Sequence, residues 1–331
     1  MITIVPSTEV ALGHRAYHVA VAESGHVAAV SREGVGTFFA PDHTTCTTFR
    51  LPADAGDVAI SAAGSLLAVT ARGRLTLIST STFRPVLRLN ESFECSCFNP
   101  AGALWSAARW DEDSVAVEIR ERETWRVVAR AELTDPFRDS SFSIMPHADG
   151  EHVAIWAAAG QDGQCLFWAH RDGSQIIFTR FPGVESTTPP SFTPSGDRFL
   201  VVCDLNELRE YIFPLGPLHK KMPWPFDDMD NQIGERVSYA GSTHALLHST
   251  ADRLYLVDLR KMAITDEVSL RGHAPKPAAE VYPKLGEELG LCSDLGHFAP
   301  LPTGGFLSVH HGAGHDSLLT WHLPPRRIPS E

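Results

Sequence analysis

A short pattern of a small residue, a glycine and alternating apolar residues recurs seven times along the chain. The copies begin at Ser24, Ala63, Ala101, Asp149, Ser195, Ala240 and Thr303. Of the third and fifth residues after each glycine, thirteen of fourteen are apolar, with His244 the exception. A period of two is typical of a β-strand, and glycine suits the positive φ of a hairpin turn. The pattern therefore predicts seven hairpins, each leading into a buried strand.

The spacing of the seven glycines indicates how these hairpins are organised. They are 39, 38, 48, 46, 45 and 63 residues apart, and the last interval contains an insertion over Arg271–Leu295. Apart from that interval, the spacing is close to the length of a four-stranded propeller blade. The sequence predicts an all-β, seven-bladed β-propeller with antiparallel blades and one domain over residues 1–331. The expected blades are residues 16–51, 57–90, 94–133, 141–182, 188–225, 232–270 and 295–324.

The first apolar segment, Ile2–Val5, belongs to no complete blade. A propeller ring needs a closure, and pairing between the two ends of the chain removes an exposed sheet edge. We therefore expect Ile2–Val5 to pair beside Ser317–Leu323 and complete the last blade. The alternative is a frayed tail.

Several stretches carry a resemblance to a known repeat. They are VAISAAGSLLAVTARGRLTLIS from Val58, FNPAG from Phe98, SFTPSGDRFLVV from Ser191 and LYLVDLRKMAITDEVSLRGH from Leu254. In their order of strands and turns they resemble WD40 repeats, and this resemblance implies a propeller that presents a rigid face to other proteins.

The family's hydrogen-bonded tetrad joins a histidine, a Ser or Thr, an Asp and a Trp. His273, Ser308 and Trp321 match it, whereas the aspartate position falls on His315, one residue before Asp316. This departure puts the tetrad in doubt. Most other blades lack the set, so we expect the blades to be held together mainly by apolar layers.

Composition and charge narrow the classes of function. The net charge of −12 opposes a large nucleic-acid surface, which needs a basic field. The sequence shows neither a secretory leader nor an apolar run long enough to cross a bilayer, so we expect a cytoplasmic protein without membrane contact. The six scattered cysteines are expected to be reduced core residues.

Departures from the blade rhythm mark the candidate partner-binding residues. In Leu215–Glu235, Trp224 and Phe226 stand between prolines, where they form either a docking patch or a cap folded under the blade. Trp110 and Tyr282, the latter within the insertion, complete the predicted contact surface.

A histidine-rich turn provides a candidate metal site. Because adjacent strand residues point to opposite faces, His310 and His311 do not readily share one ion. A site would require His311, His315 and His14, and the alternative is surface or hydrogen-bonding histidines. Cys95 and Cys97 share a strand face but lack a second cysteine pair, so buried thiols are the default and no cofactor is expected.

Motifs for catalysis are missing from the sequence, including G-x-S-x-G, the P-loop and H-E-x-x-H. The alternating charges of Glu118–Glu123 are expected to form a solvated strand face. The predicted function is a non-catalytic scaffold that binds another protein. The alternative is a propeller hydrolase or lyase with a metal or carboxylates at the central channel, and candidates by position are Asp57, Glu94, Asp139, Glu185 and Glu235.

Overall fold

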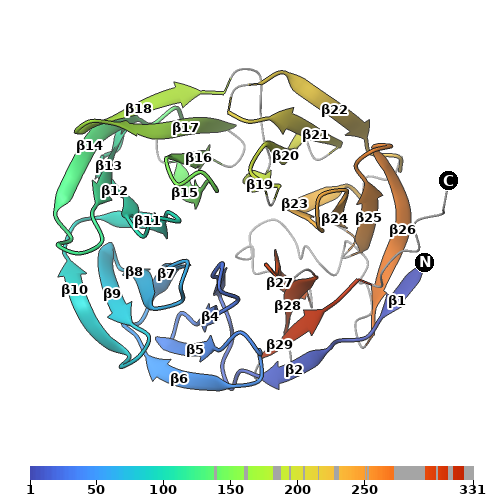
Figure 1. Cartoon of the computed structure of the whole chain (residues 1–331), viewed down its shortest axis with the longest axis horizontal. Helices are drawn as coiled ribbons and strands as arrows, with labels where there is room; N and C mark the ends of the chain where they lie inside the picture. The colour runs from blue at the N-terminus through green and yellow to red at the C-terminus, as the bar shows by residue number, and fades with distance from the viewer. Residues whose placement is uncertain are drawn as a thin grey trace.

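Seven β-sheets surround a central axis and form a closed ring (Figure 1). The computed structural model describes residues 1–137, 140–159, 163–181, 188–193, 195–203, 206–214, 216–226, 231–249, 251, 253–271, 295–302, 305–311 and 316–323. All regular secondary structure within these ranges is β-strand. The predicted seven-bladed β-propeller is confirmed.

Each blade places its earliest strand next to the axis and its latest strand at the rim, except that the N-terminus supplies the outer strand of blade seven and an additional outer strand of blade six. Blades one to three consist of β3 (His18–Val21), β4 (Val27–Val30), β5 (Val35–Phe39) and β6 (Cys46–Arg50); β7 (Ala55–Ile60), β8 (Leu66–Ala71), β9 (Arg74–Ser79) and β10 (Arg84–Leu89); and β11 (Phe93–Phe98), β12 (Leu104–Asp111), β13 (Ser114–Arg120) and β14 (Val127–Thr134).

The remaining blades follow the same order. Blades four to seven consist of β15 (Ser141–Pro146), β16 (His152–Ala158), β17 (Gln164–Asp172) and β18 (Gln175–Arg180); β19 (Ser191–Phe192), β20 (Arg198–Cys203), β21 (Glu207–Ile212) and β22 (Leu218–Pro223); β23 (Ile233–Tyr239), β24 (His244–Ser249), β25 (Leu254–Asp258) and β26 (Ala263–Leu270); and β27 (Leu295–Pro300), β28 (Phe306–His311) and β29 (Asp316–Trp321). Two further strands, β1 (Ile2–Ile4) and β2 (Thr8–Ala11), precede blade one.

The repeated glycine occupies the hairpin before the second strand of each blade. In the first six copies it adopts a φ between 72° and 87°, and the seventh copy's Gly304 lies outside the described residues. Gly64 is required for a second reason, because a Cβ there would collide with the ring of His26 in the neighbouring blade. The predicted turn role of these glycines is therefore confirmed in the first six copies.

The second strands form the core because both of their faces are covered. The thirteen predicted apolar positions are at most 1% exposed. The residues that alternate with them are also buried, and most are small: Ala29, Ala68, Ser106, Ala154, Leu200, Ala245 and Ser308. Within the described residues, seven apolar clusters fill the seven interfaces between adjacent blades. Apolar layers between blades thus supply the main stabilisation.

The ring is closed by β2 and not by the segment expected from the sequence. β2 pairs antiparallel with β29, from Thr8 opposite Thr320 to Ala11 opposite Ser317. The prediction that Ile2–Val5 completes blade seven is wrong, because β1 instead runs parallel to β26 as a fifth strand of blade six. The reason is packing: Ile4 is buried in the apolar cluster between blades six and seven.

A buried carboxylate fastens the segment that follows β2. Asp316 is fully buried, and its Oδ2 accepts a hydrogen bond of 2.7 Å from the backbone N–H of Ala16. Its own backbone N–H donates to the carbonyl oxygen of His14, and its carbonyl oxygen accepts from the N–H of Leu12. Asp316 of blade seven thereby binds Leu12, His14 and Ala16, in the segment that leads from β2 into blade one.

Five cysteines lie in the described part of the chain, and all are free thiols. Four of them are buried as expected, but Cys46 is exposed because it lies on the outermost strand of its blade. Within the described residues, none of the elements is a helix with the length and hydropathy needed to cross a membrane.

Deleting residues 1–11 should lower the urea midpoint of unfolding much more than deleting residues 1–6. The shorter deletion removes β1 and the burial of Ile4, worth about 1.5–3 kcal/mol. The longer deletion also removes β2 and leaves blade seven with an unpaired edge. Circular dichroism of both truncated proteins measures the difference, and equal midpoints would show that β2 does not close the ring.

Candidate functional site

The most exposed aromatic side chain of the described protein is Trp110, at the end of β12. It is 69% exposed, and the guanidinium carbon of Arg130 lies 5.2 Å from its ring centroid. Arg130 donates from Nη1 to Oε1 of Glu118 at 2.8 Å, and Arg120 donates from Nη2 to Oε2 of the same carboxylate at 2.7 Å. The indole of Trp110 therefore makes a cation–π contact with Arg130, and the ion pair with Glu118 holds Arg130 in place.

The carboxylate under Arg130 corrects an expectation from the sequence. Glu118 and Arg120 do not lie on a solvated face, since both are buried. The third strand of blade three is covered on both sides, and alternating charges alone did not reveal this. Two arginines compensate the buried charge of Glu118, and removing Glu118 would leave the buried Arg120 without its carboxylate partner.

Trp224 and Phe226 lie just beyond β22, at the interface of blades five and six. The Trp224 ring packs against Tyr255 at a centroid distance of 5.4 Å, and its Nε1 donates to the carbonyl oxygen of Asn231. Phe226 packs against both rings but stays 39% exposed. Trp224 thus caps the apolar layer, whereas Phe226 offers an edge to solvent.

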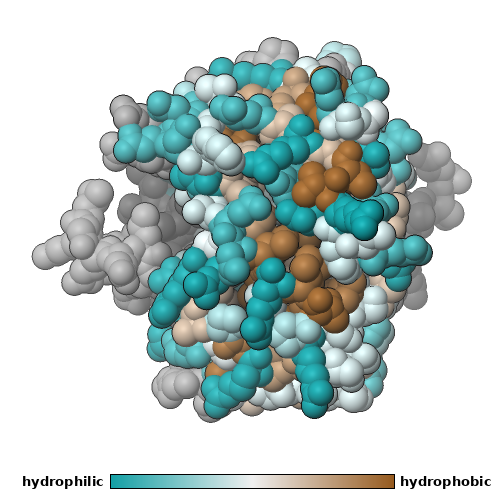
Figure 2. All heavy atoms as spheres, turned by 90° about the vertical axis from the view of Figure 1, so that its left-hand side faces the viewer, coloured by the Kyte–Doolittle hydropathy of each residue, from teal (hydrophilic) through white to brown (hydrophobic). Residues whose placement is uncertain are grey.

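The structure does not gather the predicted contact residues into one patch. Trp110 belongs to blade three, whereas Trp224 and Phe226 follow the last strand of blade five. Tyr282 and the insertion around it lie outside the described residues. Figure 2 shows the rim around β10 and β14, where apolar side chains lie among polar ones, and both Val86 on β10 and Val127 on β14 are exposed.

The tetrad-like residues are joined in part. Nε1 of Trp321 donates to Oγ of Ser308 at 2.7 Å, and both residues are fully buried. Asp316 is bound to Ala16 and lies 3.0 Å from Nδ1 of His311. His273 lies outside the described residues, so this part of the expected tetrad stays a prediction.

The candidate metal ligands have other partners. Nδ1 of His311 lies 3.0 Å from Oδ2 of Asp316, and Nε2 of His14 lies 3.0 Å from Oγ1 of Thr37. His315 lies outside the described residues. Across the part of the chain that the structure describes, no three His, Cys, Asp or Glu side chains are grouped so that they could hold a metal ion.

A hollow of about 440 Å³ lies among the inner strands of blades two to four and is lined by Glu94, Arg109 and Phe142. Arg109 binds the carboxylate of Glu94, and its Nη1 lies 3.2 Å from Oδ2 of Asp135. Partial burial opposes ionisation of Asp135, but hydrogen bonds from Ser140, Phe137 and Arg109 lower its pKa. Of the remaining channel candidates, Asp139, Glu185 and the side chain of Glu235 lie outside the described part.

Asp57, on the inner strand β7, differs from these paired carboxylates. Burial raises its pKa to about 6, although the backbone N–H of Ser96 donates to its Oδ2 at 3.0 Å. Burial also raises the pKa of the neighbouring thiols Cys95 and Cys97. These thiols therefore stay protonated at neutral pH, as expected of core cysteines.

The comparisons with known proteins identify the fold. No family model matches the chain, and no curated protein matches it. The β-propeller domain of Cps50 (Swd1) from Myceliophteria thermophila superposes with a TM-score of 0.67 and 14% identity, covering 96% of this chain and 99% of that chain. A chain of the Mitotic Checkpoint Complex superposes with a TM-score of 0.68 and 12% identity, covering 98% of this chain and 93% of that chain. The protein is a WD40-like β-propeller in fold, and identities this low carry no function.

Trp224→Ala should lower the free energy of unfolding by about 2–3 kcal/mol, because it empties part of the layer between blades five and six. Phe226→Ala should lower it by less than about 1 kcal/mol, because that ring is partly in water already. Urea titration of both variants measures the contrast. Equal losses would mean that the two rings share one structural role.

Asp57→Asn should raise the urea midpoint at pH 7.5, and the gain should shrink towards pH 4. The folded pKa of about 6 exceeds the ordinary value of 3.8, so ionisation destabilises the folded state increasingly between those values and fully above them. Unfolding at several pH values measures the effect.

Asp42→Asn provides the control of opposite sign. Hydrogen bonds from Thr45 and Thr44 lower the pKa of Asp42 to about 2, so its ionised form stabilises the fold. This variant should lose stability at pH 7.5 and lose less as the pH falls. A pH-independent gain for Asp57→Asn would show that charge burial is not its cause.

Proposed function

We propose that the protein is a non-catalytic scaffold that binds another protein through the rim of its propeller. The observation that carries this proposal is the exposure of Trp110 on a rigid support. Tryptophan and arginine are the residues most enriched among those that dominate binding energy at protein interfaces. Here an exposed indole and the guanidinium of Arg130 are stacked on one blade.

The contacts beneath Trp110 favour binding because they already restrict the side chain of Arg130 before a partner arrives. Arg130 is held by the buried carboxylate of Glu118, and that carboxylate is held in turn by Arg120. A side chain that is already positioned loses less conformational entropy when a partner covers it. Phe226 provides a second exposed aromatic edge on blade five and is proposed as a further contact.

The structural neighbours agree with this role at a coarse level. One of them was solved as part of the Mitotic Checkpoint Complex, a multiprotein assembly. A subunit role in an assembly is therefore a natural use of this fold. The proposal places the protein in the cytoplasm, in line with the free cysteines of its described part.

A hydrolase or lyase at the central channel has weaker support. Glu94, which lines the hollow, and the neighbouring Asp135 both form ion pairs with Arg109. Such an ion-paired cluster is typical of a structural network and leaves no ready proton donor. Asp57 has a raised pKa, but its described hydrogen bond is to a backbone N–H of the neighbouring blade.

Trp110→Ala should reduce capture of the partner by at least about tenfold, the effect of a typical interface hot spot. The tagged protein is purified from its native host under mild conditions, and each co-purifying protein is quantified by mass spectrometry. Ile177→Ala is the matched control because Ile177 is an exposed apolar residue on the outer strand of blade four. Both variants should melt at the parent temperature.

Capture that is unchanged in Trp110→Ala, or reduced equally in both variants, would contradict the proposed surface. Elemental analysis of the same preparations tests the alternative function, a hydrolase or lyase with a metal at the central channel. A metal at one equivalent per chain that persists through purification would favour the enzyme over the scaffold.

A further inference from the structure

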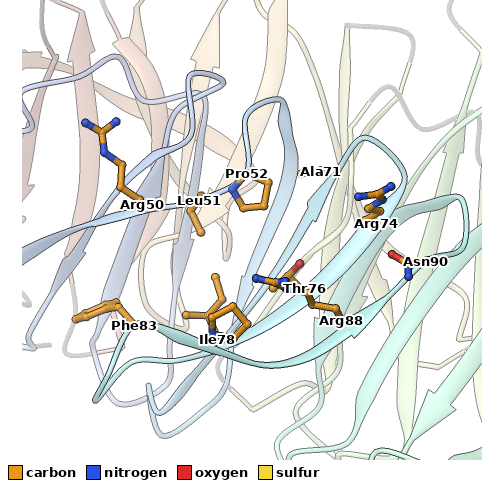
Figure 3. Close-up of a pocket in the computed structure, with 11 residues that line it drawn as sticks. Arg50, Leu51, Pro52, Ala71, Arg74, Thr76, Ile78, Phe83, Arg88 and Asn90 are labelled. Carbon is orange, nitrogen blue, oxygen red and sulfur yellow. The ribbon is translucent and has the colours of Figure 1, made fainter.

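A basic groove lies at the outer junction of blades one and two (Figure 3). Its volume is about 370 Å³, and its walls come from β9 and β10 of blade two and from the end of β6 in blade one. In Figure 3, Arg50 lies at one end, Arg74 at the other and Arg88 between them. The groove belongs to neither the channel nor the surface around Trp110.

The three arginines of the groove are exposed. Within the described residues, no carboxylate forms an ion pair with Arg50, Arg74 or Arg88. Asp54, which lies close along the chain, binds Arg72 instead at 2.6 Å. Three uncompensated cations in one groove are unusual in a chain with a net charge of −12. They create a local positive field on an acidic molecule.

Between the arginines, the groove is apolar and well supported. Ile78 is buried, and Pro85 lies opposite it on the neighbouring strand. Phe83 stacks on Phe49 of blade one, with ring centroids 4.8 Å apart and planes inclined by 21°. This surface is therefore fixed by the contact between the two blades and does not depend on a ligand to form it.

We infer that this groove binds a short extended peptide segment of a partner protein in which carboxylate side chains flank an apolar one. The carboxylates would pair with Arg74, Arg88 and Arg50, and an arginine fork can hold a carboxylate through two hydrogen bonds. The apolar side chain would cover Ile78 and Phe83. Charge complementarity selects the acidic segment, and the apolar floor selects a peptide over a simple anion.

The charge of the whole molecule opposes a longer polyanion. A nucleic acid or an anionic membrane would extend beyond the groove and meet a surface whose net charge is negative. A short segment meets only the basic groove. The inference rests on the proposed role in protein binding, but it concerns a different surface from that of Trp110.

The test uses a fluorescein-labelled ten-residue peptide in which glutamate pairs alternate with single leucine or phenylalanine residues. Fluorescence anisotropy measures its dissociation constant for the full-length protein. The matched peptide with glutamine in place of every glutamate should bind at least tenfold more weakly. Raising NaCl from 50 to 300 mM should weaken the acidic peptide severalfold, because ion pairs dominate its contacts.

Variants locate the binding site. Arg74→Glu and Arg88→Glu should each weaken the acidic peptide at least tenfold, and Phe83→Ala should weaken it severalfold. Arg84→Glu is the control, since Arg84 is an exposed residue of the same strand β10 but lies outside the groove. That variant should change affinity by less than twofold. All variants are checked by thermal melting.

The inference is overturned if the acidic peptide does not bind, if the glutamine peptide binds equally well, or if Arg84→Glu is as harmful as Arg88→Glu. The inference is also overturned, in favour of a general anion site, if a 20-base-pair DNA duplex displaces the acidic peptide when its phosphate concentration equals the concentration of peptide carboxylates. Trp110→Ala should leave peptide affinity unchanged. A result that rejects peptide binding in the groove is therefore distinguishable from a result that rejects partner binding through Trp110.

Discussion

Closure of the ring is the constraint on which the rest of this structure depends. The second strand of each blade is buried on both faces, and this burial exists only while a neighbouring blade covers each face. An open series of seven blades would expose two apolar layers at its ends. The interface between blades seven and one is therefore as necessary as the other six, although most of blade seven lies at the opposite end of the sequence from blade one. β2 and Asp316 supply that connection.

The same constraint explains where the chain can carry function. The layers between blades are filled with apolar side chains, and the hairpin turns are occupied by glycines whose backbone is fixed. Variation without loss of the fold is therefore confined to the rim, the loops and the mouth of the channel. Both surfaces that we associate with binding, Trp110 and the groove between blades one and two, lie in such places.

Much of the fold could be predicted from the sequence because its strongest signal is local. A glycine turn followed by apolar residues at a period of two repeats often enough to define seven blades. The closing strand could not be predicted in the same way. The segment Thr8–Ala11 is short and partly polar, whereas Ile2–Val5 is more apolar, so the hydrophobic pattern selects Ile2–Val5 as the closing strand. Its apolar side chains are instead used to extend blade six.

The candidate sites depended more on long-range contacts and were predicted less well. Proline-flanked aromatics signalled Trp224 and Phe226, but only packing against Tyr255 separates the cap from the exposed edge. The buried Glu118 looked like one charge in an alternating series. The sequence does not reveal the basic groove, because Arg50 and Arg88 come from different blades. The one local hint was the alternation of Arg74, Thr76 and Ile78, which places all three on one strand face.

Native-state hydrogen exchange of the backbone amides tests the central claim most directly. If β2 closes the ring, the amides of β29 exchange only through global unfolding, with the same free energy as those of the buried second strands β8 and β16. If instead the amides of β2 and β29 exchange together through a local opening several kcal/mol below the global value, the closure is an appendage, and the other six interfaces hold the propeller without it.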